Sequence, residues 1–428
     1  MIDGEKGTIN AADSSGLIQF APHCEIAVPG LVVVVAIRKE LRDEVLSRLG
    51  APDEWIVNFP DQCDCGVFLA SEEGTGPFAT ELDIIEKKLA SLQPVIAVGP
   101  FAGLGLRALL LSKAKEANLP CTLIVLKSER GSEISSAQRQ LAIELARTVG
   151  GAKEHGFQHV IIVETSSTLI SHIFKFVEYG ANRPELHGPF DVIGDVHGCI
   201  RELELLLEKL GYVFGSQGAQ QTPGHPEHRK LVFAGDLVDR GPDSPSVVRL
   251  VRKLVADGHA LCVPGNHDDK LVRHFRGTLK KVSRGLKSTI AQYDLLPEQT
   301  LADDIAFLES LPHHLVLDDG RLIVAHAGLP QNLQNRHSPK VRNFALYGQH
   351  GPNTTQDGFP IRLDWAQSYT GGAWVVHGHT PVTAPRTLNR VVCIDTGCVF
   401  GGALTAYRYP EQEFVSVTAK QAHFFNRF

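Results

Sequence analysis

The sequence predicts an α/β protein of two domains, and chain length and apolar patterning carry this prediction. At 428 residues the chain is long enough for two or three domains, and its 43% hydrophobic content is typical of globular proteins with real cores. Short β-branched runs alternate with stretches that carry apolar residues at helical spacing, which is typical of βαβ units and parallel sheets. A stretch rich in Gly, Pro and Asn at 180–189 divides the chain. We therefore predict a flexible tail at 1–15, one domain at 16–182 and a second at 183–428.

The order of elements follows from the same patterns. In the first domain we expect strands at 31–37, 95–99, 122–126 and 159–163, and helices at 40–49, 82–92, 104–117 and 137–149. The second domain is expected to begin with a strand at 190–193, followed by a helix whose apolar face is Ile200, Leu203, Leu207 and Leu210. The long segment 329–372 is expected to shape a pocket.

Composition excludes several classes of protein. A net charge of -6 argues against a protein coated in nucleic acid by general electrostatics. The polar N-terminus has no signal-peptide pattern, and the apolar run 31–37 is too short to span a membrane. The eight cysteines are scattered, so we expect reduced, packed thiols and a cytoplasmic protein.

Five short polar motifs mark the second domain. They are Gly194–Gly198, Gly235–Gly241, Gly265–Asp268, Ala325–Ala327 and Gly378–Pro381. Each follows an apolar run, and the carboxyl ends of parallel strands meet at one edge of a sheet, where α/β sites form. Any single motif could be a simple turn with no functional role, whereas five such motifs in this order are poorly explained by turns alone. We therefore expect their side chains to converge on one site.

Six side chains in these motifs predict a site for two divalent cations. They are Asp195, His197, Asp236, Asn266, His326 and His379. Carboxylate, imidazole and amide oxygen ligands suit borderline or hard divalent ions. Asp195 and His197 are one residue apart, so an extended turn lets both face one ion. We assign Asp236 as the bridging carboxylate and the last three residues to the second ion. Two ions held in this way can clamp a phosphate and activate a water for in-line attack.

Four further residues have predicted catalytic roles: Arg240, His267, Asp239 and Asp395. Arg240 can bind a phosphate oxygen bidentately. His267 is the candidate general acid for the leaving group, and Asp239 is expected to hold its tautomer. Asp395 is a candidate for orienting a metal-bound histidine or water, with a simple Asp-Thr-Gly turn as the alternative.

The motifs resemble the metallophosphoesterase superfamily, in its phosphoprotein-phosphatase-like branch. The strings Gly188–Cys199, Phe344–Gly348 and Ile394–Gly402 look like the phosphatase domain of bacterial polynucleotide kinase-phosphatase. The last string is also similar to small bacterial bis(5'-nucleosyl)-tetraphosphatase-like enzymes. The resemblance covers about residues 187–417. It implies an α/β/β/α calcineurin-like sandwich, manganese or similar ions, and removal of 3'-phosphates and 2',3'-cyclic phosphates from RNA ends, a step of RNA repair.

The first domain departs from that family. A P-loop kinase precedes the phosphatase there, but after the strand at 31–35 this chain reads Ala36–Leu41, without the Gly-x-x-x-x-Gly-Lys-Ser/Thr signature. Lys39 cannot substitute, because the glycines and the hydroxyl are missing. Asp61 and Gly99–Gly103 are interpreted as an ordinary loop residue and a helix start. We predict a degenerate P-loop kinase-like domain without kinase activity, retained for docking, stability or assembly.

The leading hypothesis is a metal-dependent phosphatase acting on phosphomonoesters or 2',3'-cyclic phosphodiesters of nucleotides or RNA ends. Manganese is the expected ion, with iron, zinc or nickel as alternatives. The alternative functions are a dinucleoside polyphosphate hydrolase, a Ser/Thr protein phosphatase, and a binding or regulatory protein whose first domain recruits a protein partner. No membrane partner is expected, and the oligomeric state stays open. The basic segment 273–287 either faces the site or is a solvated helix face, which we favour.

Overall fold

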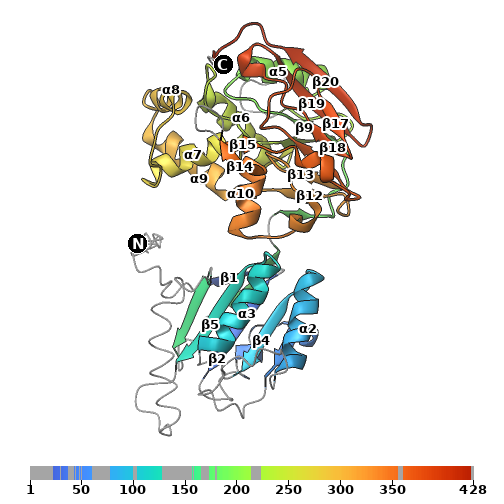
Figure 1. Ribbon diagram of the computed structural model, residues 1–428. Helices are drawn as coiled ribbons and strands as arrows, with labels where there is room; N and C mark the ends of the chain where they lie inside the picture. The colour runs from blue at the N-terminus through green and yellow to red at the C-terminus, as the bar shows by residue number, and fades with distance from the viewer. Residues whose placement is uncertain are drawn as a thin grey trace. The chain divides into compact units, whose positions relative to one another are not determined.

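The computed structural model describes residues 23–28, 30–36, 51–59, 78–99, 104–127, 159–164, 173–178, 181–213, 223–354 and 360–425, with single positions between 43 and 157. The chain forms two compact units, one within Met1–Tyr179 and the other formed by Gly180–Asn335 and Pro339–Phe428. Each unit has its own sheets and its own core (Figure 1).

The first unit is built on a five-stranded parallel sheet. Its strands, in spatial order, are β3 (Ile56–Asn58), β4 (Val95–Gly99), β2 (Leu31–Ala36), β5 (Cys121–Lys127) and β6 (His159–Glu164). Successive residues of β2 face opposite sides: Val33 and Val35 enter one apolar cluster, and Val32 and Val34 enter another. Both faces are therefore covered, which is the rule for parallel sheets.

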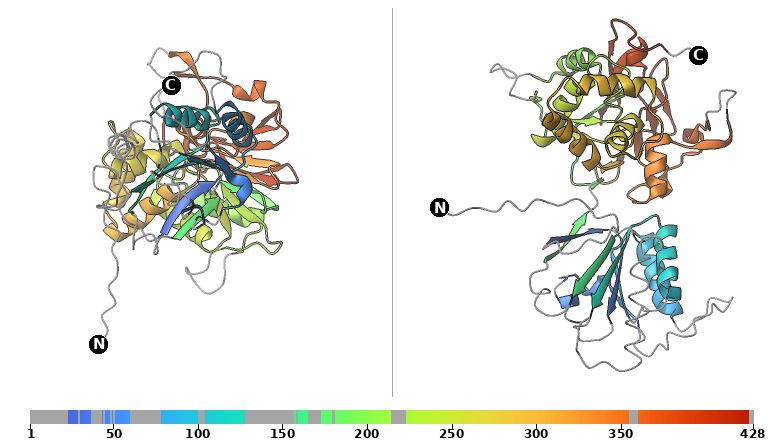
Figure 2. Two further views of the ribbon diagram at one scale, coloured as in Figure 1. Left: turned by 90° about the horizontal axis from the view of Figure 1, so that it is seen from below. Right: turned by 90° about the vertical axis from the view of Figure 1, so that its left-hand side faces the viewer.

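Two helices lie side by side on one face of this sheet, α2 (Ala79–Ala90) and α3 (Leu104–Glu116) (Figure 2). A separate parallel pair joins β1 (His23–Val28) and β7 (Ile173–Glu178). The four predicted strands and two of the predicted helices are present here, with ends shifted by up to three residues. Of the predicted helix at 40–49, positions 43, 45–47 and 49 are described, and they are helical. The predicted helix at 137–149, the tail at 1–15, Asp61 and most of the turn at 99–103 lie outside the described residues.

The second unit contains two sheets that pack face to face. One has the strands β11 (Ala260–Cys262), β10 (Lys230–Phe233), β9 (Phe190–Ile193), β19 (Ala403–Tyr409) and β20 (Glu413–Thr418) in that order. The other has β17 (Arg386–Leu388), β18 (Val391–Cys393), β16 (Trp374–His377), β13 (Leu322–Val324), β12 (Leu315–Leu317) and β8 (Asn182–Arg183). The core between them draws on both, as with Phe190 and Val232 from the first sheet and Leu322 and Val376 from the second.

Helices cover the outer faces of the two sheets (Figure 1). The first sheet is covered by α5 (Ile200–Leu210), α6 (Ser244–Ala256), α7 (Asn266–Phe275), α8 (Arg284–Tyr293) and α9 (Glu298–Ser310). The second is covered by α10 (Pro339–Tyr347) and the short 3-10 helix η4 (Trp365–Ser368). The layers are therefore α/β/β/α, and the predicted fold class is confirmed.

The segment 329–372 is not one long loop. It contains α10, η4 and a hairpin of β14 (His350–Thr354) and β15 (Pro360–Arg362). No helix in the described ranges is both long and apolar enough to cross a membrane. The five cysteines whose thiols are described are buried and form no disulfide with one another: Cys121, Cys199, Cys262, Cys393 and Cys398.

Candidate active site

The six predicted ligand residues lie together where loops leave the strands of both sheets. Asp195 follows β9, Asp236 follows β10, and Asn266 opens α7 just after β11. From the second sheet, His326 follows β13 and His379 follows β16. All six side chains are buried, none more than 9% exposed. The order of the strands thus brings motifs more than 180 residues apart into one site. The backbone N–H of His379, for example, donates to the carboxylate of Asp195.

One carboxylate oxygen stands between two groups of ligand atoms. Oδ2 of Asp236 lies 3.5 Å from Nε2 of His197 and 3.4 Å from Nε2 of His326. Asp195, Asp236 and His326 form one group whose ligand atoms lie within 4.8 Å of one another, and His197, Asp236 and His267 form another. Asp236 is common to both, as a bridging ligand must be. The sequence placed Asp195 and His197 on one ion, whereas in these groups they fall on different sides of Asp236.

Backbone carbonyls fix which nitrogen of two histidines is free to bind a cation. Nδ1 of His326 lies 3.0 Å from the carbonyl oxygen of Ala234, and Nδ1 of His197 lies 2.7 Å from that of Val238. A carbonyl only accepts, so both Nδ1 atoms carry a proton and both Nε2 atoms keep a lone pair in the neutral ring. Such backbone anchoring is the usual support of histidine ligands.

The donor atoms around His326 fit a cation. Its Nε2 lies 3.1 Å from Oδ1 of Asn266 and 3.0 Å from Nδ1 of His379, in addition to Oδ2 of Asp236. Nε2 of His379 is buried without a hydrogen-bond partner in the described structure. Several lone pairs that converge in a buried space are stable only if a positive charge screens them. The residues therefore fit a divalent cation at this point.

The pKa shifts of the cluster show the same need for positive charge. Burial, together with the charges of Asp395 and Asp236, raises the pKa of Asp195 well above its usual value. Burial opposes the charged form of His326, yet the charge of Asp236 raises the pKa of that ring overall. Burial also works against ionised Asp236, but His326 and His267 beside it hold its pKa well below the usual value. The site thus keeps Asp236 ionised and favours cations around it.

Five site residues have backbone conformations that side chains rarely adopt. The φ angles are 45° for His197, 49° for Asp236, 74° for Asp239, 71° for Arg240 and 70° for His379. A left-handed conformation at a residue with a Cβ atom is strained, and such residues concentrate at functional sites.

Two glycines allow backbone to pass directly against the acidic ligands. A Cβ atom at Gly378 would overlap Oδ1 of Asp195, and one at Gly265 would overlap Oδ1 of Asp236. Glycine is therefore required at these two positions, because the backbone approaches the carboxylate too closely for a side chain.

Arg240, His267 and Asp239 form a hydrogen-bonded chain beside Asp236. Nδ1 of His267 donates to Oδ2 of Asp239 at 2.6 Å, which leaves Nε2 to accept from Nη2 of Arg240 at 2.9 Å. Nη1 of Arg240 donates to Nε2 of His197 at 2.7 Å. Burial lowers the pKa of His267 in this setting. These contacts have the geometry that the predicted acid role requires, and the role itself stays a prediction.

Asp395 lies close to Asp195 but takes up the simpler geometry. Its Oδ1 accepts from the backbone N–H of Gly397 at 3.1 Å, which is the Asp-Thr-Gly turn. Burial raises its pKa to about 6, with a further contribution from the charge of Asp236. In the described ranges its side chain interacts with that of Asp195 and reaches no ligand histidine, so its orienting role stays a prediction.

Several residues of the site were missed by sequence reasoning. Asp268 accepts from the backbone N–H groups of Leu237, Val238 and Gly265 and so ties two motif loops together. Thr289, from α8, donates to Oδ1 of Asp239 at 2.8 Å. Asp268 stood inside a motif and could have been found there, whereas nothing in the sequence marks Thr289.

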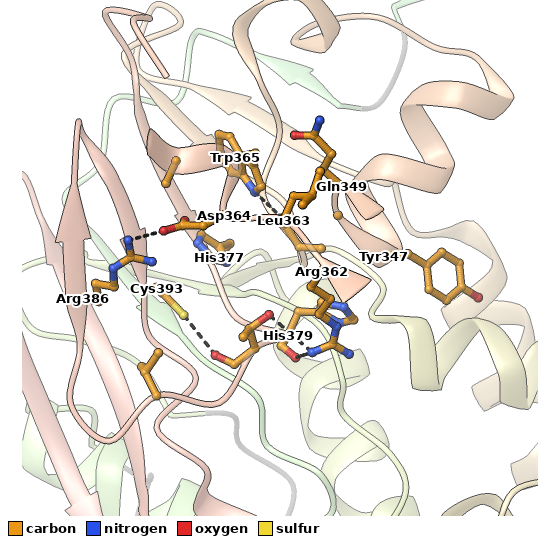
Figure 3. Close-up of a pocket in the computed structure, with 15 residues that line it drawn as sticks. Tyr347, Gln349, Arg362, Leu363, Asp364, Trp365, His377, His379, Arg386 and Cys393 are labelled. Atoms are coloured by element: carbon orange, nitrogen blue, oxygen red, sulfur yellow. Dashed lines mark hydrogen bonds and ion pairs between the residues drawn. The ribbon is translucent and has the colours of Figure 1, made fainter. Parts of the chain in front are cut away.

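Two cations also face the cluster without an acidic partner among the described residues, half-buried Lys270 and exposed Arg362. Lys270 lies on the same face of α7 as Asn266 and His267, four and three residues further on. Among the described residues it forms no hydrogen bond or ion pair. Arg362 ends β15, and its Nη1 donates only to the carbonyl of His379 at 3.3 Å and to Oγ1 of Thr380 at 3.5 Å (Figure 3). Burial lowers the pKa of both groups, although the charge of Asp236 reaches each of them and works in the other direction.

A pocket opens beside His379 (Figure 3). Its cavity is about 180 Å³, and it is lined by Arg362, Trp365, His377, His379 and Cys393, among others. Trp365 is fixed as a wall by its indole N–H, which donates to the carbonyl of Ala327 at 3.3 Å. The pocket therefore offers room for a flat apolar group next to the ligand cluster, and it includes residues of the segment 329–372 as expected.

The basic segment 273–287 splits into groups with different surroundings. Arg276 pairs with Glu309 of α9 at 2.6 Å, and Lys281 and Lys287 are exposed. Arg284 instead lies over the ring of Phe424, 5.6 Å from its centroid. Most of the segment is thus a solvated face, in line with the favoured interpretation.

Comparison with known proteins agrees with this geometry. The family model for calcineurin-like phosphoesterases matches residues 188–387. The bis(5'-nucleosyl)-tetraphosphatase PrpE (asymmetrical) of Geobacillus thermodenitrificans is 49% identical over 242 residues, which are 56% of this chain and 97% of that protein. The chain belongs to the calcineurin-like phosphoesterase family. It is therefore a metal-dependent phosphoric ester hydrolase, of a family that uses a dinuclear divalent metal centre.

Two further proteins match over a similar share of this chain. The enzyme of the same name from Anoxybacillus flavithermus is 46% identical over 243 residues, 56% of this chain and 98% of that protein. A solved structure of a serine/threonine phosphatase from Saccharomyces cerevisiae has 17% identity and a TM-score of 0.38, covering 56% of this chain and 81% of its own.

Proposed function

We propose that the phosphoesterase unit hydrolyses the phosphate chain of dinucleoside polyphosphates. The observation that carries this proposal is the set of cations around Asp236: Arg240, Lys270 and Arg362, from three different elements. Once bound metal ions compensate the ligand carboxylates, these three charges are left for the substrate. A single phosphate does not use all of them, whereas a chain of phosphates does. The names of the similar bacterial enzymes support the same substrate class.

The six donor residues Asp195, His197, Asp236, Asn266, His326 and His379 would hold two divalent cations. Manganese is the proposed ion, with iron, zinc or nickel as alternatives, because histidine, carboxylate and amide ligands accept them all. When bound, such ions supply Lewis-acid polarisation of phosphoryl oxygens and lower the pKa of a water that serves as nucleophile.

The chain's own residues bind and orient the reacting phosphate. Arg240 presents N–H groups beside both ligand groups, so it can grip two oxygens of the phosphate that is attacked. Nε2 of His267 faces the same guanidinium and can hold the proton that the leaving oxygen takes up. Asp239, itself held by Thr289, accepts from Nδ1 of His267 and keeps the ring in place. Nε2 is therefore the nitrogen that takes up the second proton of a charged ring, on the side that faces the substrate. The N-terminus of α7, at Asn266, adds favourable dipoles for an anion.

Lys270 is proposed to bind the phosphates that are not attacked. Replacing it with Met is expected to lower kcat/KM for diadenosine tetraphosphate by about 10- to 100-fold more than for p-nitrophenyl phosphate, the loss of one hydrogen bond to a charged group. Lys270→Arg should retain most of the preference for the chain. Lys287→Met, an exposed change on α8, is the matched control. Steady-state kinetics on both substrates measure the effect, and equal losses on both would contradict the assignment.

Binding without turnover gives an independent reading of the same residue. Protein loaded with a divalent cation that does not support turnover should bind a non-hydrolysable tripolyphosphate analogue more tightly than phosphate, and Lys270→Met should remove most of that difference. Equilibrium dialysis at two salt concentrations separates this effect from general surface charge.

Hydrolysis at RNA ends, of 3'-phosphates and 2',3'-cyclic phosphates, is the second candidate. The observation that favours it is the first unit, whose five-stranded parallel sheet has β2 at its centre. That arrangement supports a degenerate P-loop kinase-like module at 16–182 ahead of a phosphatase domain at 183–428, as in polynucleotide kinase-phosphatase. The module would bind RNA or a protein partner rather than transfer phosphate, since the Walker A residues are missing.

A side-by-side substrate panel tests both candidates. With manganese present, we expect diadenosine tetraphosphate to be split asymmetrically, into products that carry three phosphates and one, faster than 2',3'-cyclic AMP or 3'-AMP. Chromatography of the products measures this directly, with Asp236→Ala as the inactive control. Faster turnover of the cyclic and 3'-phosphate substrates would move the function to RNA ends, and turnover of a phosphoserine peptide alone would reject both candidates.

A further inference from the structure

The phosphate-binding candidate Arg240 is packed against two aromatic rings that have no part in the proposed chemistry. Its guanidinium carbon lies 5.3 Å from the ring centroid of Phe400 and 5.9 Å from that of Phe424. The two rings contact each other, with centroids 6.4 Å apart and planes at 66°. Both distances are within the range at which a guanidinium is attracted by an aromatic ring.

Phe424 comes from the C-terminal segment, and the backbone fixes its place. The N–H groups of His423 and Phe424 both donate to the carbonyl oxygen of Val399, at 2.9 and 3.1 Å. Val399 and Phe400 belong to the 3-10 helix η5 (Cys398–Phe400), which follows Asp395. The segment around Phe424 is therefore joined to the same loop that supplies Phe400, and the two rings arrive at Arg240 together.

Arg240 needs such support because few other contacts fix its direction. Its backbone is in the left-handed region, and its guanidinium reaches both His197 and His267 across the site. On the other side, a Cβ atom at Gly285 would lie 3.1 Å from Cγ of Arg240, so α8 limits how far the stem can move. A ring against the flat face of a guanidinium leaves its N–H edge free for hydrogen bonds.

Two like charges share the ring of Phe424. The guanidinium of Arg284 lies 5.6 Å from the centroid of the ring that Arg240 also contacts. The ring attracts both cations and so offsets part of the repulsion between them.

We propose that Phe400 and Phe424 are positioning residues that orient Arg240 for phosphate binding, with Phe424 supplied by the C-terminal segment. The proposal rests on the proposed phosphate-binding function of Arg240. According to this proposal, Phe424 belongs to the phosphate-binding site although it lies far along the chain from all five motifs.

Three variants separate positioning from simple packing, since both rings also pack against the core of the unit. Phe424→Leu keeps apolar volume but removes the ring, Phe424→Tyr keeps the ring, and Phe425→Leu changes the adjacent residue, which is 75% exposed. We expect Phe424→Leu to lower kcat/KM by about 5- to 30-fold, the range of a partly buried cation–π contact. Phe424→Tyr and Phe425→Leu should be close to the parent, and the thermal midpoints of all three should be similar.

A double-mutant cycle decides whether the effect acts through Arg240. In an Arg240→Ala background, Phe424→Leu should cause little further loss. A full additional loss in that background, or an unchanged Phe424→Leu single variant, would overturn the proposal. The cycle is measured with p-nitrophenyl phosphate as well as with diadenosine tetraphosphate, so its result does not depend on the proposed substrate. If the parent protein hydrolyses p-nitrophenyl phosphate but not the dinucleotide, the proposed function is wrong, while the positioning of Arg240 is still tested.

Discussion

Replacing Asp236 with Asn is expected to lower turnover of every substrate by at least about a thousandfold, because a bridging ligand serves both ions of a two-metal site. Oδ2 of Asp236 is the atom shared by the His197 and His326 groups, at 3.5 and 3.4 Å. An amide places either a neutral oxygen or an NH2 group at this shared point, and in the first case its NH2 group meets the backbone N–H of His267, which donates to Oδ1 of Asp236. It therefore weakens both groups, whereas loss of Asn266 or His379 affects one.

Metal binding gives the same prediction a readout that does not depend on activity. Manganese should raise the thermal midpoint of the parent protein, since a ligand that binds only the folded state stabilises it, and chelation should reverse the shift. Asp236→Asn should lose most of this shift and bind fewer manganese ions per chain in equilibrium dialysis. Asp294→Asn, the same chemical change at an exposed position after α8, should behave as the parent. Unchanged metal content in Asp236→Asn would reject the bridging assignment.

The sequence predicts this site well where chemistry and strand order act together. All six predicted ligands are short side chains placed shortly after strands, and parallel strands bring the residues at their carboxyl ends to one edge of the sheet. Local spacing says less about which ion each ligand serves: Asp195 and His197 are near neighbours in sequence but fall in different groups around Asp236, and their shared ion stays a prediction. The left-handed backbone at His197 is not predicted by any of the residue types.

Residues that reach the site from outside the motifs could not be predicted in this way. Arg362 stands on a hairpin inside the segment 329–372, and Phe424 lies in the C-terminal segment. Their positions depend on tertiary packing, which a single sequence does not encode in a local pattern. Lys270 is an intermediate case: its spacing from His267 on a helix could have placed it on the same face, had the start of α7 been known.

The second large effect is expected from His267, and it should depend on the leaving group. Replacing His267 with Gln removes the group proposed to protonate the leaving oxygen, which contributes about 10²–10⁴-fold in acid catalysis. The loss should approach that range for 3'-AMP, whose leaving group is a sugar alkoxide. It should be smaller for p-nitrophenyl phosphate, and smaller again for diadenosine tetraphosphate, whose leaving phosphate is already a weak base.

The contacts of His267 explain why the proton would be present when it is needed. Burial lowers the pKa of the ring in the described structure, and the guanidinium of Arg240 faces its free nitrogen. A bound phosphate brings negative charge to that guanidinium and to Nε2, which favours the protonated ring, while Asp239 stabilises it from behind. Asp239→Asn should therefore lower turnover of the three substrates in the same order as His267→Gln, but by smaller factors.

If His267→Gln slows all three substrates by one common factor, the ring orients the phosphate with Arg240 instead of donating a proton. The polar chain from Thr289 through Asp239 to His267 would then serve binding alone.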